Sequence, residues 1–359
     1  MKFTIVGGGN IGTLIAVHCA EKGHEVTIMT SAPEVFQDTL QIVDEKDQLL
    51  REGKIKTATS DPEVAYSDAD YIIVTLPANL MKPCADAIYS YAGKDTVIGV
   101  VPGNGGSECM FRPCIERGST FFLMQRVPSI ARLVKKGRCV RSTGYKSSLY
   151  ISSIPKARAE VCSRVMEDLF EIPCEIVPGL LNLTLTPSNP ILHTTRLRSL
   201  FKDYHEGVVY EKIPLFYEEW DDDSSRILLS CDEELQKICR SIPELKLDHV
   251  VPLSEYYESP TPEALTRKMR NIEAFKGIGT PSVRVEGGFI PDLHSRYFTA
   301  DFSFGLSIIR QVGRMAGVDT PHIDETMAWY SKIAVEPASF DYRLYGITDR
   351  DSLVKFYNQ

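Results

Sequence analysis

The stretch KFTIVGGGNIG, residues 2–12, joins a short apolar strand to a glycine-rich turn. Gly7, Gly9 and Gly12 have the spacing G-x-G-x-x-G, and apolar residues then recur at the spacing of a helix. Gly23 lies where such a helix ends, and a second apolar strand follows directly. A glycine fingerprint between a strand and a helix is typical of a dinucleotide-binding site.

Each glycine of this fingerprint has a separate expected task. Gly7 permits the tight turn, Gly9 lets the backbone approach a pyrophosphate, and Gly12 lets the helix pack against the strand. The backbone N–H groups of Asn10 and Ile11, at the start of the helix, would hold the anion. A tight glycine turn without any ligand is the alternative interpretation.

The end of the second strand, residues 25–29, bears on the choice between NAD and NADP. In NAD sites a carboxylate there binds the ribose 2′-OH, but here Thr30 and Ser31 follow the strand. The arginine typical of NADP sites is missing as well. Because the two hydroxyls can bind a phosphate, we slightly favour NADP over NAD. The alternative is that they only cap a helix beginning near Pro33.

Two later loops are expected to complete the cofactor site. Residues 71–76 form a continuous apolar run, as in a strand buried on both faces, and residues 96–101 form the next strand. Loops at the carboxyl ends of parallel strands face the crevice in which ligands bind. For the second loop, residues 102–106, a plain flexible turn is the alternative. The candidate contacts in these loops are Leu76, Pro77, Pro102 and Gly103.

Strands and helices alternate up to about residue 177, and mostly helical spacing follows. A chain of 359 residues exceeds what one hydrophobic core usually serves. We therefore predict an α/β Rossmann domain with a doubly wound parallel sheet over residues 1–178, followed by an all-α substrate domain over residues 179–359. Residues 138–144 and 146–154 are predicted to pair as a hairpin.

Composition and charge narrow the class of protein. Hydrophobic residues make up 43% and charged residues 25%, which are ordinary values for a globular protein. A formal charge of −8 provides no general basic field, so we expect no nucleic-acid partner. The apolar runs are too short for a membrane helix or a signal peptide, and we expect neither.

The nine cysteines form no CxxC pair and lie mostly inside apolar segments. We interpret them as buried thiols, which favours a cytoplasmic location. Cys109 and Cys114 have no accompanying histidine, so we expect buried packing there and no metal site. The oligomeric state stays open, with a homodimer as one option.

An acidic cluster at residues 218–223 precedes a helix predicted over residues 225–240. Carboxylates suit the start of a helix, so a solvated helix start is the simplest interpretation. A weaker hypothesis is that the cluster attracts a cationic group of a substrate.

Two polar segments supply candidates for the chemistry. Asn189 and His193 lie one helical turn apart where the helical part begins, although Asn189 followed by Pro190 also reads as a purely structural helix start. Arg296 and Asp301 stand in a polar break before an apolar helix predicted over residues 302–312. Asp301 also reads as the N-cap of that helix.

At these residues the sequence resembles a known family. The glycine fingerprint, the PGNGG loop at 102–106, Asn-x-x-x-His at 189–193 and Arg-Tyr-Phe-Thr-x-Asp at 296–301 together look like opine dehydrogenases of the octopine/nopaline dehydrogenase family. Ala300 stands where the family usually has an acidic residue. The resemblance implies an NAD(P)H-dependent enzyme that reductively condenses a 2-oxo acid with an amino acid.

The resemblance also implies a role for each candidate. His193 would be the acid/base, and Asp301 its partner, which fixes the tautomer of the imidazole. Arg296 would clamp the carboxylate of the oxo acid, because its guanidinium matches two carboxylate oxygens, and Asn189 would contact substrate.

Three other functions compete. Ketopantoate reductases and glycerol-3-phosphate dehydrogenases resemble this architecture, but they use a lysine at the start of the helical domain. This chain has His193 there, and the next lysine after it is Lys202. A 2-hydroxy acid dehydrogenase would use the same His, Asp and Arg on a C=O group. A non-catalytic dinucleotide sensor would need no acid/base pair.

Overall fold

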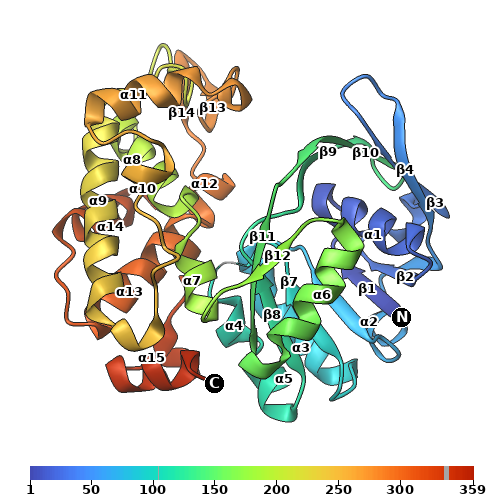
Figure 1. Ribbon diagram of the computed structural model, residues 1–359. Coiled ribbons are helices and arrows are strands. Elements are labelled where there is room, and N and C mark those ends of the chain that lie inside the picture. Colours follow the sequence, from blue (N-terminus) through green and yellow to red (C-terminus); the bar gives the residue numbers. More distant parts are fainter. Residues whose placement is uncertain (104, 335–338) are drawn as a thin grey trace. The chain divides into compact units, whose positions relative to one another are not determined.

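The computed structural model describes residues 1–103, 105–334 and 339–359, which fold into two compact units. The first unit is formed by residues 1–184 and 357–359, and the second by residues 185–356 (Figure 1). The domain boundary predicted at residues 178–179 stays a prediction. In the structure, Thr184 and Tyr357 belong to the first unit, where both side-chain hydroxyls donate hydrogen bonds to Glu108.

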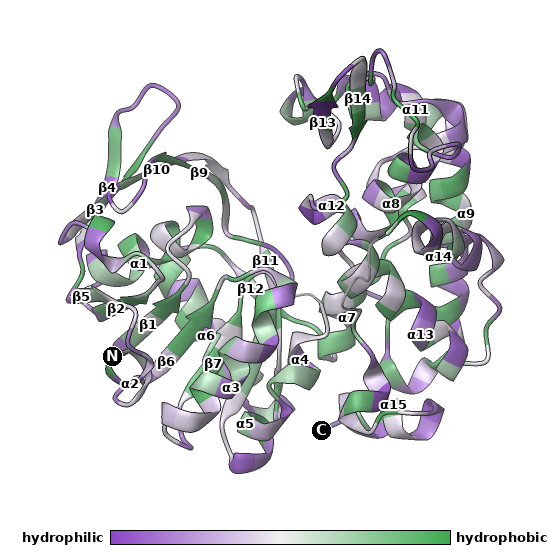
Figure 2. Cartoon of the chain, turned by 180° about the vertical axis from the view of Figure 1, so that it is seen from behind, coloured by the Kyte–Doolittle hydropathy of each residue, from purple (hydrophilic) through white to green (hydrophobic). Residues whose placement is uncertain are grey.

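The first unit is built around an eight-stranded sheet. Its strands in sheet order are β12 (Cys174–Ile176), β11 (Leu149–Ile154), β8 (Thr120–Met124), β7 (Val97–Val100), β6 (Tyr71–Val74), β1 (Lys2–Val6), β2 (Glu25–Met29) and β5 (Thr57–Thr59). Neighbouring strands run parallel except where β11 meets β8. The central strands β6, β7 and β8 are buried at every residue, which explains their continuous apolar sequences (Figure 2).

Helices connect these strands and cover the sheet (Figure 1). They are α1 (Asn10–Glu21), α2 (Pro62–Tyr66), α3 (Met81–Tyr91), α4 (Ser107–Met110), α5 (Arg112–Arg117) and α6 (Ala159–Phe170). Helix α7 (Leu180–Leu185) follows the last strand, β12, and leads to the second unit. Helix α1 ends as predicted, because Gly23 adopts a φ of 79° just beyond it. Cys109 and Cys114 are fully buried, as predicted.

A second sheet of four strands was missed in part by the sequence analysis. Its order is β4 (Leu49–Lys54), β3 (Thr39–Val43), β10 (Cys139–Tyr145) and β9 (Ser129–Lys135). The predicted hairpin of residues 138–154 is wrong, because β10 pairs with β9 and β3 whereas β11 pairs with β8 and β12. The prediction paired two strands that are consecutive in the sequence. In the structure each of them pairs with strands from other parts of the chain.

The second unit is mostly helical. Its helices are α8 (Asn189–Leu200), α9 (Asp222–Ser241), α10 (Leu253–Tyr256), α11 (Pro262–Asn271), α12 (Arg296–Thr299), α13 (Ser307–Met315), α14 (Pro321–Ile333) and α15 (Arg350–Tyr357). Helix α9 packs against α8, α11 and α14 and forms the centre of the unit (Figure 1). A short hairpin, β13 (Ser282–Val285) and β14 (Gly288–Pro291), was not predicted. The predicted fold class is confirmed with that addition.

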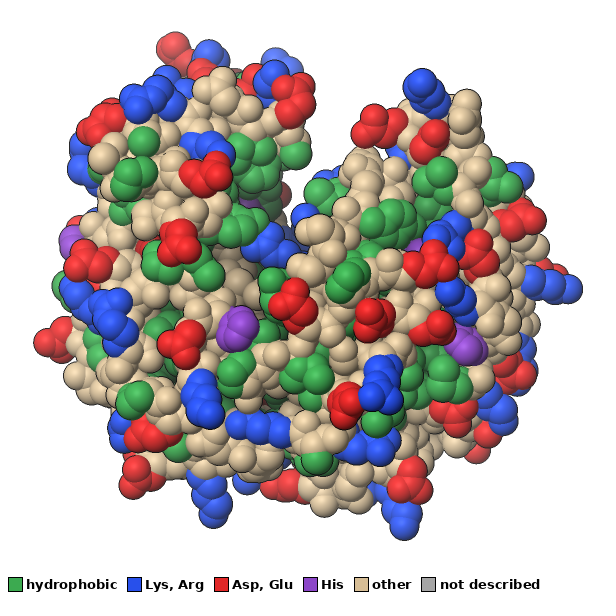
Figure 3. Space-filling view, in the orientation of Figure 1, with side chains coloured by type: hydrophobic (Ala, Val, Ile, Leu, Met, Phe, Trp, Pro, Cys, Tyr) green, Lys and Arg blue, Asp and Glu red, His purple; other side chains and the backbone are tan. Residues whose placement is uncertain are grey.

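The surface carries charges of both signs. Acidic and basic side chains are interspersed over the face shown in Figure 3. In the part of the chain that the structure describes, we find no helix with the length and apolar character needed to cross a membrane.

Candidate active site

The glycine turn after β1 has little room for side chains at two of its three fingerprint positions. Gly7 adopts a φ of 106°, a conformation that L side chains rarely adopt. A Cβ on Gly12 would lie 1.7 Å from the carbonyl oxygen of Gly7, whereas a Cβ on Gly9 would meet nothing within 4 Å. The turn is therefore closed where helix meets strand and open at Gly9.

The start of helix α1 offers backbone donors. Gly9 is its N-cap residue and provides no side-chain cap, so the first turn receives no side-chain acceptor from this position. The side chain of Asn10 is turned to β9, where its Oδ1 accepts a hydrogen bond of 2.8 Å from the N–H of Leu133. Asn10 and Ile11 thus offer backbone N–H groups, which is what an anion at a helix start needs.

Thr30 and Ser31 follow β2 as predicted, but they do not cap a helix. Only a 3-10 turn forms at Pro33–Val35, and its N-cap residue is Ala32, without a side-chain cap. Thr30 Oγ1 accepts a long hydrogen bond of 3.4 Å from the N–H of Ala32, and Ser31 is exposed. The capping interpretation is therefore wrong, and their contact with a cofactor stays a prediction.

Leu76 lies beside the glycine turn. A Cβ placed on Gly7 would be 3.3 Å from its Cδ2. Pro77 follows, and Pro102 and Gly103 come after β7, the neighbour of β6 in the sheet. The N–H of Gly103 donates a 2.6 Å hydrogen bond to Met124 at the end of β8, so this loop starts at the same sheet edge. Asn104 lies outside the described residues.

In the second unit His193 is held through both ring nitrogens. Its Nδ1 is 2.8 Å from Oδ2 of Asp301, and its Nε2 is 2.9 Å from the hydroxyl of Tyr217. A carboxylate only accepts hydrogen bonds, so Nδ1 carries the proton and Nε2 is the acceptor in the neutral ring. The imidazole is 7% exposed. The structure thus brings His193 and Asp301 together across 108 residues of sequence.

Asp301 does not cap the following helix. Its side chain forms no cap hydrogen bond, and its backbone carbonyl accepts from the N–H of Leu306, five residues on. Residues Phe302–Leu306 form a π-helical segment before α13 begins, so the predicted regular helix over 302–312 is wrong at its start. Such wide turns are frequent at functional sites.

Aromatic rings fix the plane of His193. The ring of Tyr297 stacks on it with centroids 4.0 Å apart and an interplanar angle of 14°. Phe216 meets it edge-on at 5.6 Å. Because Tyr297 is in α12, the 296–301 segment supplies both the stacking ring and the carboxylate partner.

Arg296 and Asn189 are exposed, and each is close in sequence to a residue of this cluster. Arg296 directly precedes Tyr297 in α12. Asn189 is the first residue of α8, one turn before His193, and the N-cap residue is Ser188 rather than Asn189. The predicted capping role of Asn189 is therefore wrong, and residues four apart on a helix share a face.

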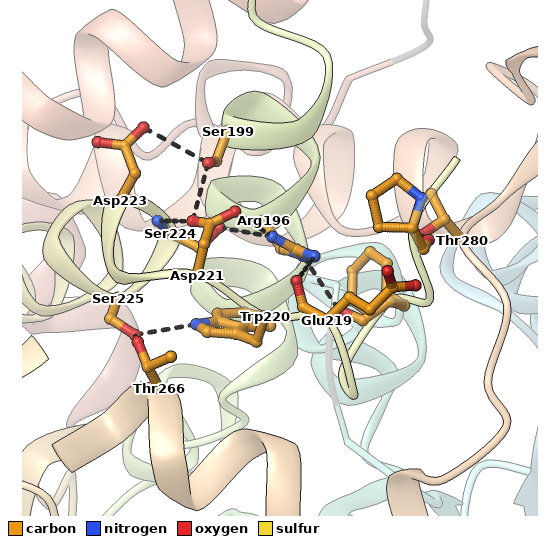
Figure 4. Close-up of polar contacts among 12 residues, drawn as sticks. Arg196, Ser199, Glu219, Trp220, Asp221, Asp223, Ser224, Ser225, Thr266 and Thr280 are labelled. Carbon is orange, nitrogen blue, oxygen red and sulfur yellow. Dashed lines mark hydrogen bonds and ion pairs between the residues drawn. The ribbon is translucent and has the colours of Figure 1, made fainter. Parts of the chain in front are cut away.

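Sequence reasoning missed Tyr217 and Arg196. Arg196 is one turn beyond His193 in α8 and is fully buried beneath the segment 215–221 (Figure 4). Its guanidinium donates to the carbonyls of Phe216 at 3.0 Å and Glu219 at 2.6 Å, and pairs with Asp221 at 2.6 Å. The sequence clue was an arginine inside the buried part of a helix, opposite an acidic cluster that had no assigned partner.

The acidic cluster has structural tasks. Asp221 caps α9, since it accepts from the N–H of Ser224 at 2.7 Å, and it also balances Arg196. Burial lowers the pKa of the Arg196 guanidinium, and the charge of Asp221 opposes that shift. Glu218 and Glu219 each accept a 2.6 Å hydrogen bond from a backbone N–H. These contacts favour the helix-start interpretation over attraction of a cationic substrate.

Two family models match the chain. Residues 2–104 match the model described as NAD-dependent glycerol-3-phosphate dehydrogenase N-terminus. Residues 176–334 match the model described as NAD/NADP octopine/nopaline dehydrogenase, alpha-helical domain.

Relatives match over most of the chain. A tauropine dehydrogenase from Arabella iricolor is 24% identical over 92% of this chain and 90% of its own. An opine dehydrogenase from Haliotis discus hannai is 27% identical, again over 92% of this chain and 90% of its own. A structure of octopine dehydrogenase with NADH and L-arginine has a TM-score of 0.85 at 23% identity, covering 99% of this chain and 98% of that one, so the fold is shared. The chain is thus similar to opine dehydrogenases over nearly its whole length, and its residues 176–334 match the model of the octopine/nopaline dehydrogenase helical domain.

Proposed function

We propose that this protein is an NAD(P)H-dependent opine dehydrogenase, which reductively condenses a pyruvate-like 2-oxo acid with an amino acid to an N-(carboxyalkyl)amino acid. The observation that carries the proposal is the pairing of His193 with Asp301 at 2.8 Å in a chain related to opine dehydrogenases over 92% of its length.

The glycine turn fits a dinucleotide. The open space at Gly9 and the backbone N–H groups at the start of α1 suit a pyrophosphate, and Gly7 and Gly12 suit the tight turn beneath it. Thr30, Ser31, Leu76, Pro77, Pro102 and Gly103 would line the rest of the cofactor site. When bound, the cofactor supplies the hydride. Without a carboxylate after β2, NADP stays slightly favoured over NAD.

His193 holds and moves the proton in this proposal. Asp301 keeps the proton of the neutral ring on Nδ1, so Nε2 is the nitrogen that exchanges a proton. The imidazole accepts a proton as the amine is activated and returns one as water leaves. Stacking by Tyr297 fixes the plane of the ring while its charge changes.

Arg296 is the proposed clamp for the carboxylate of the oxo acid. Its exposed guanidinium can reach a substrate, and a fork of N–H donors aligns a carboxylate through two oxygens. Asn189, on the turn before His193, is the proposed second substrate contact.

A 2-hydroxy acid dehydrogenase remains the second candidate, because His193, Asp301 and Arg296 would serve the reduction of a C=O group as well. A sensor is disfavoured, since it has no use for a buried histidine held by a carboxylate. Oxidation of NADPH and of NADH is measured with pyruvate alone and with each amino acid in turn. Turnover that needs the amine supports the opine reaction, and turnover with pyruvate alone contradicts it.

The variant His193→Ala tests the assigned residue. We expect cofactor binding to stay near normal while hydride transfer is lost. Full turnover by this variant would contradict the acid/base role of His193.

The cellular location and the assembly are also proposed. Eight of the nine cysteines are buried free thiols, which suits a reducing cytoplasm. A homodimer is the assembly to test, by light scattering of the purified chain.

A further inference from the structure

The nitrogen of His193 that the proposed reaction needs is already occupied. Asp301 holds Nδ1, and the hydroxyl of Tyr217 lies 2.9 Å from Nε2. A substrate can exchange a proton with Nε2 in only two ways. Either Tyr217 moves away from Nε2, or the proton passes through its hydroxyl.

Packing around Tyr217 opposes movement. The side chain is 4% exposed, its ring stacks on Phe275 with centroids 4.1 Å apart, and Phe216 meets it edge-on at 4.9 Å. A tyrosine hydroxyl lies on the axis of ring rotation, so flipping the ring leaves the oxygen in place. Its removal from Nε2 requires either a rotation about χ1, which the packing against Phe275 and Phe216 opposes, or a shift of the backbone.

The backbone is held in turn by Arg196. The guanidinium of Arg196 donates to the carbonyls of Phe216 and Glu219, on either side of Tyr217, and is anchored by Asp221 (Figure 4). Hydrogen bonds from a buried charged group are among the strongest in proteins. Arg196 therefore fixes the segment that places the hydroxyl of Tyr217 on Nε2.

The hydroxyl itself suits a relay. Burial raises the pKa of Tyr217, so the phenol keeps its proton at neutral pH. A phenol oxygen both donates and accepts, and can take a proton from Nε2 while giving its own to a second oxygen.

We propose that Tyr217 is a further catalytic residue, which relays the proton between Nε2 of His193 and the substrate, and that Arg196 is its positioning residue. This inference rests on the proposed function. When the carbinolamine loses water, the O–H bond of Tyr217 breaks and its proton joins the departing hydroxyl. The C–O electron pair leaves with the water, and the nitrogen lone pair forms the C=N bond. A new O–H bond forms on Tyr217 with the proton of the imidazolium, which becomes neutral.

The ring regains its proton from the next substrate. The ammonium group of the incoming amino acid gives a proton to the oxygen of Tyr217, and Tyr217 passes its own to Nε2. The amine is then a nucleophile and His193 is charged again, so each turnover takes up and releases one proton at this ring.

The variant Tyr217→Phe tests the relay, because it keeps the ring and removes only the hydroxyl. With NADPH or NADH, pyruvate and the best amino acid, we expect kcat to fall at least about 100-fold while the cofactor Kd stays unchanged. The matched control is Tyr204→Phe, whose ring packs on Tyr210 in the same unit, and it should keep wild-type turnover. An unchanged or increased kcat in Tyr217→Phe would show that the hydroxyl only blocks Nε2.

Arg196→Lys tests the positioning role, because lysine keeps the charge but cannot bridge several carbonyls. We expect a lower kcat and an unchanged cofactor Kd. The double variant with Tyr217→Phe should be scarcely slower than Tyr217→Phe alone, since Arg196 acts through Tyr217. Independent, multiplying effects would overturn the positioning role. If Arg196→Lys fails to fold, Tyr217→Phe still decides on the relay.

Two readouts separate failure of this inference from failure of the proposed function. No turnover by the wild type with any oxo acid and amine overturns the proposed function. In that event the ¹⁵N resonance of Nε2, recorded with labelled histidine, tests the contact: it should move in Tyr217→Phe, and an unmoved resonance overturns the inference. If the wild type turns over, the rate is measured at several fractions of D₂O. A plot of the rate against that fraction should be curved for the wild type and straight for Tyr217→Phe.

Discussion

The glycine turn of the first unit and the His193 cluster of the second are built in opposite ways. The turn is made by the backbone of residues 7–12, and leaves the N–H groups at the start of α1 without a side-chain cap. The His193 cluster is made by side chains from three separate segments, and both ring nitrogens are already hydrogen-bonded. The first arrangement suits the binding of an anion, and the second suits the transfer of a proton along existing hydrogen bonds.

The glycine turn depends on its own residues, whereas the His193 cluster depends on residues from other segments. The turn needs only small residues at fixed spacing, so its requirements are steric and local. The cluster needs Arg196 to hold the segment of Tyr217 and a π-helical segment to follow Asp301. Substitutions should therefore act on the turn through shape and on the cluster through protonation.

The largest effect is expected for Gly12→Ala. The new Cβ would lie 1.7 Å from the carbonyl oxygen of Gly7, so the turn cannot keep its shape and cofactor binding should be lost. Gly9→Ala is the matched control for fold, because its Cβ meets nothing within 4 Å, and it should weaken binding while keeping the melting temperature. Titration with NADPH and thermal unfolding measure both. If Gly12→Ala binds NADPH normally, the turn does not depend on the absence of a side chain at this position.

Asp301→Asn should change protonation and leave shape intact. An amide can donate to Nδ1 and stabilise the wrong tautomer, so we expect kcat to fall by about 10² to 10⁴ with an unchanged cofactor Kd. Asp248→Asn, at an exposed position of the same unit, is the control. Equal kcat values for the two variants would argue against the tautomer role of Asp301.

The first unit has its own buried histidine, with a different consequence. Burial, and next the charge of Arg51, lower the pKa of His18 to about 4, and its Nε2 is 2.9 Å from the hydroxyl of Tyr145. The pKa of His18 in the folded state lies below the unfolded value of about 6.5, so the folded state favours the neutral ring. The free energy of unfolding therefore has its full value above pH 6.5 and decreases as the pH falls toward 4. The loss should be about 3 kcal/mol.

Urea unfolding at pH 7 and pH 4.5 measures this loss, with His18→Gln as the variant that should lack it. Both tryptophans, Trp220 and Trp329, are in the second unit, so their fluorescence reports on that unit and circular dichroism on both. The loss of stability at pH 4.5 should therefore appear in the unfolding that circular dichroism follows. The same pH dependence in His18→Gln would rule out His18 as the cause.

The smallest effect is expected for Arg296→Lys. Lysine keeps the charge but loses the two-point geometry, so the KM for the oxo acid should rise about tenfold, equivalent to about 1.4 kcal/mol, while the cofactor Kd stays constant. Arg284→Lys, exposed on β13, is the control. A KM that stays at the wild-type value would remove Arg296 from the substrate site.

Much of the first unit could be predicted because its signals are local. Strand β2 has the predicted limits, since an apolar run, Gly23 and a flanking turn mark it within a few residues. Strands β3 and β4 were missed, and β10 received the wrong partner. The partner of a strand depends on which distant segment completes the sheet, and the residues of the strand itself do not identify that segment.

The sequence by itself determined the glycine turn, the fold class and the pair of segments that hold His193 and Asp301. These follow from spacing, because backbone conformation and helix or strand period act over a few residues. Only the tertiary structure decided that Asp301 binds His193 instead of capping a helix, and that Tyr217 lies on Nε2 with Arg196 beneath it. Those choices depend on burial, because a charged or polar side chain taken out of water binds whichever partner the fold brings near.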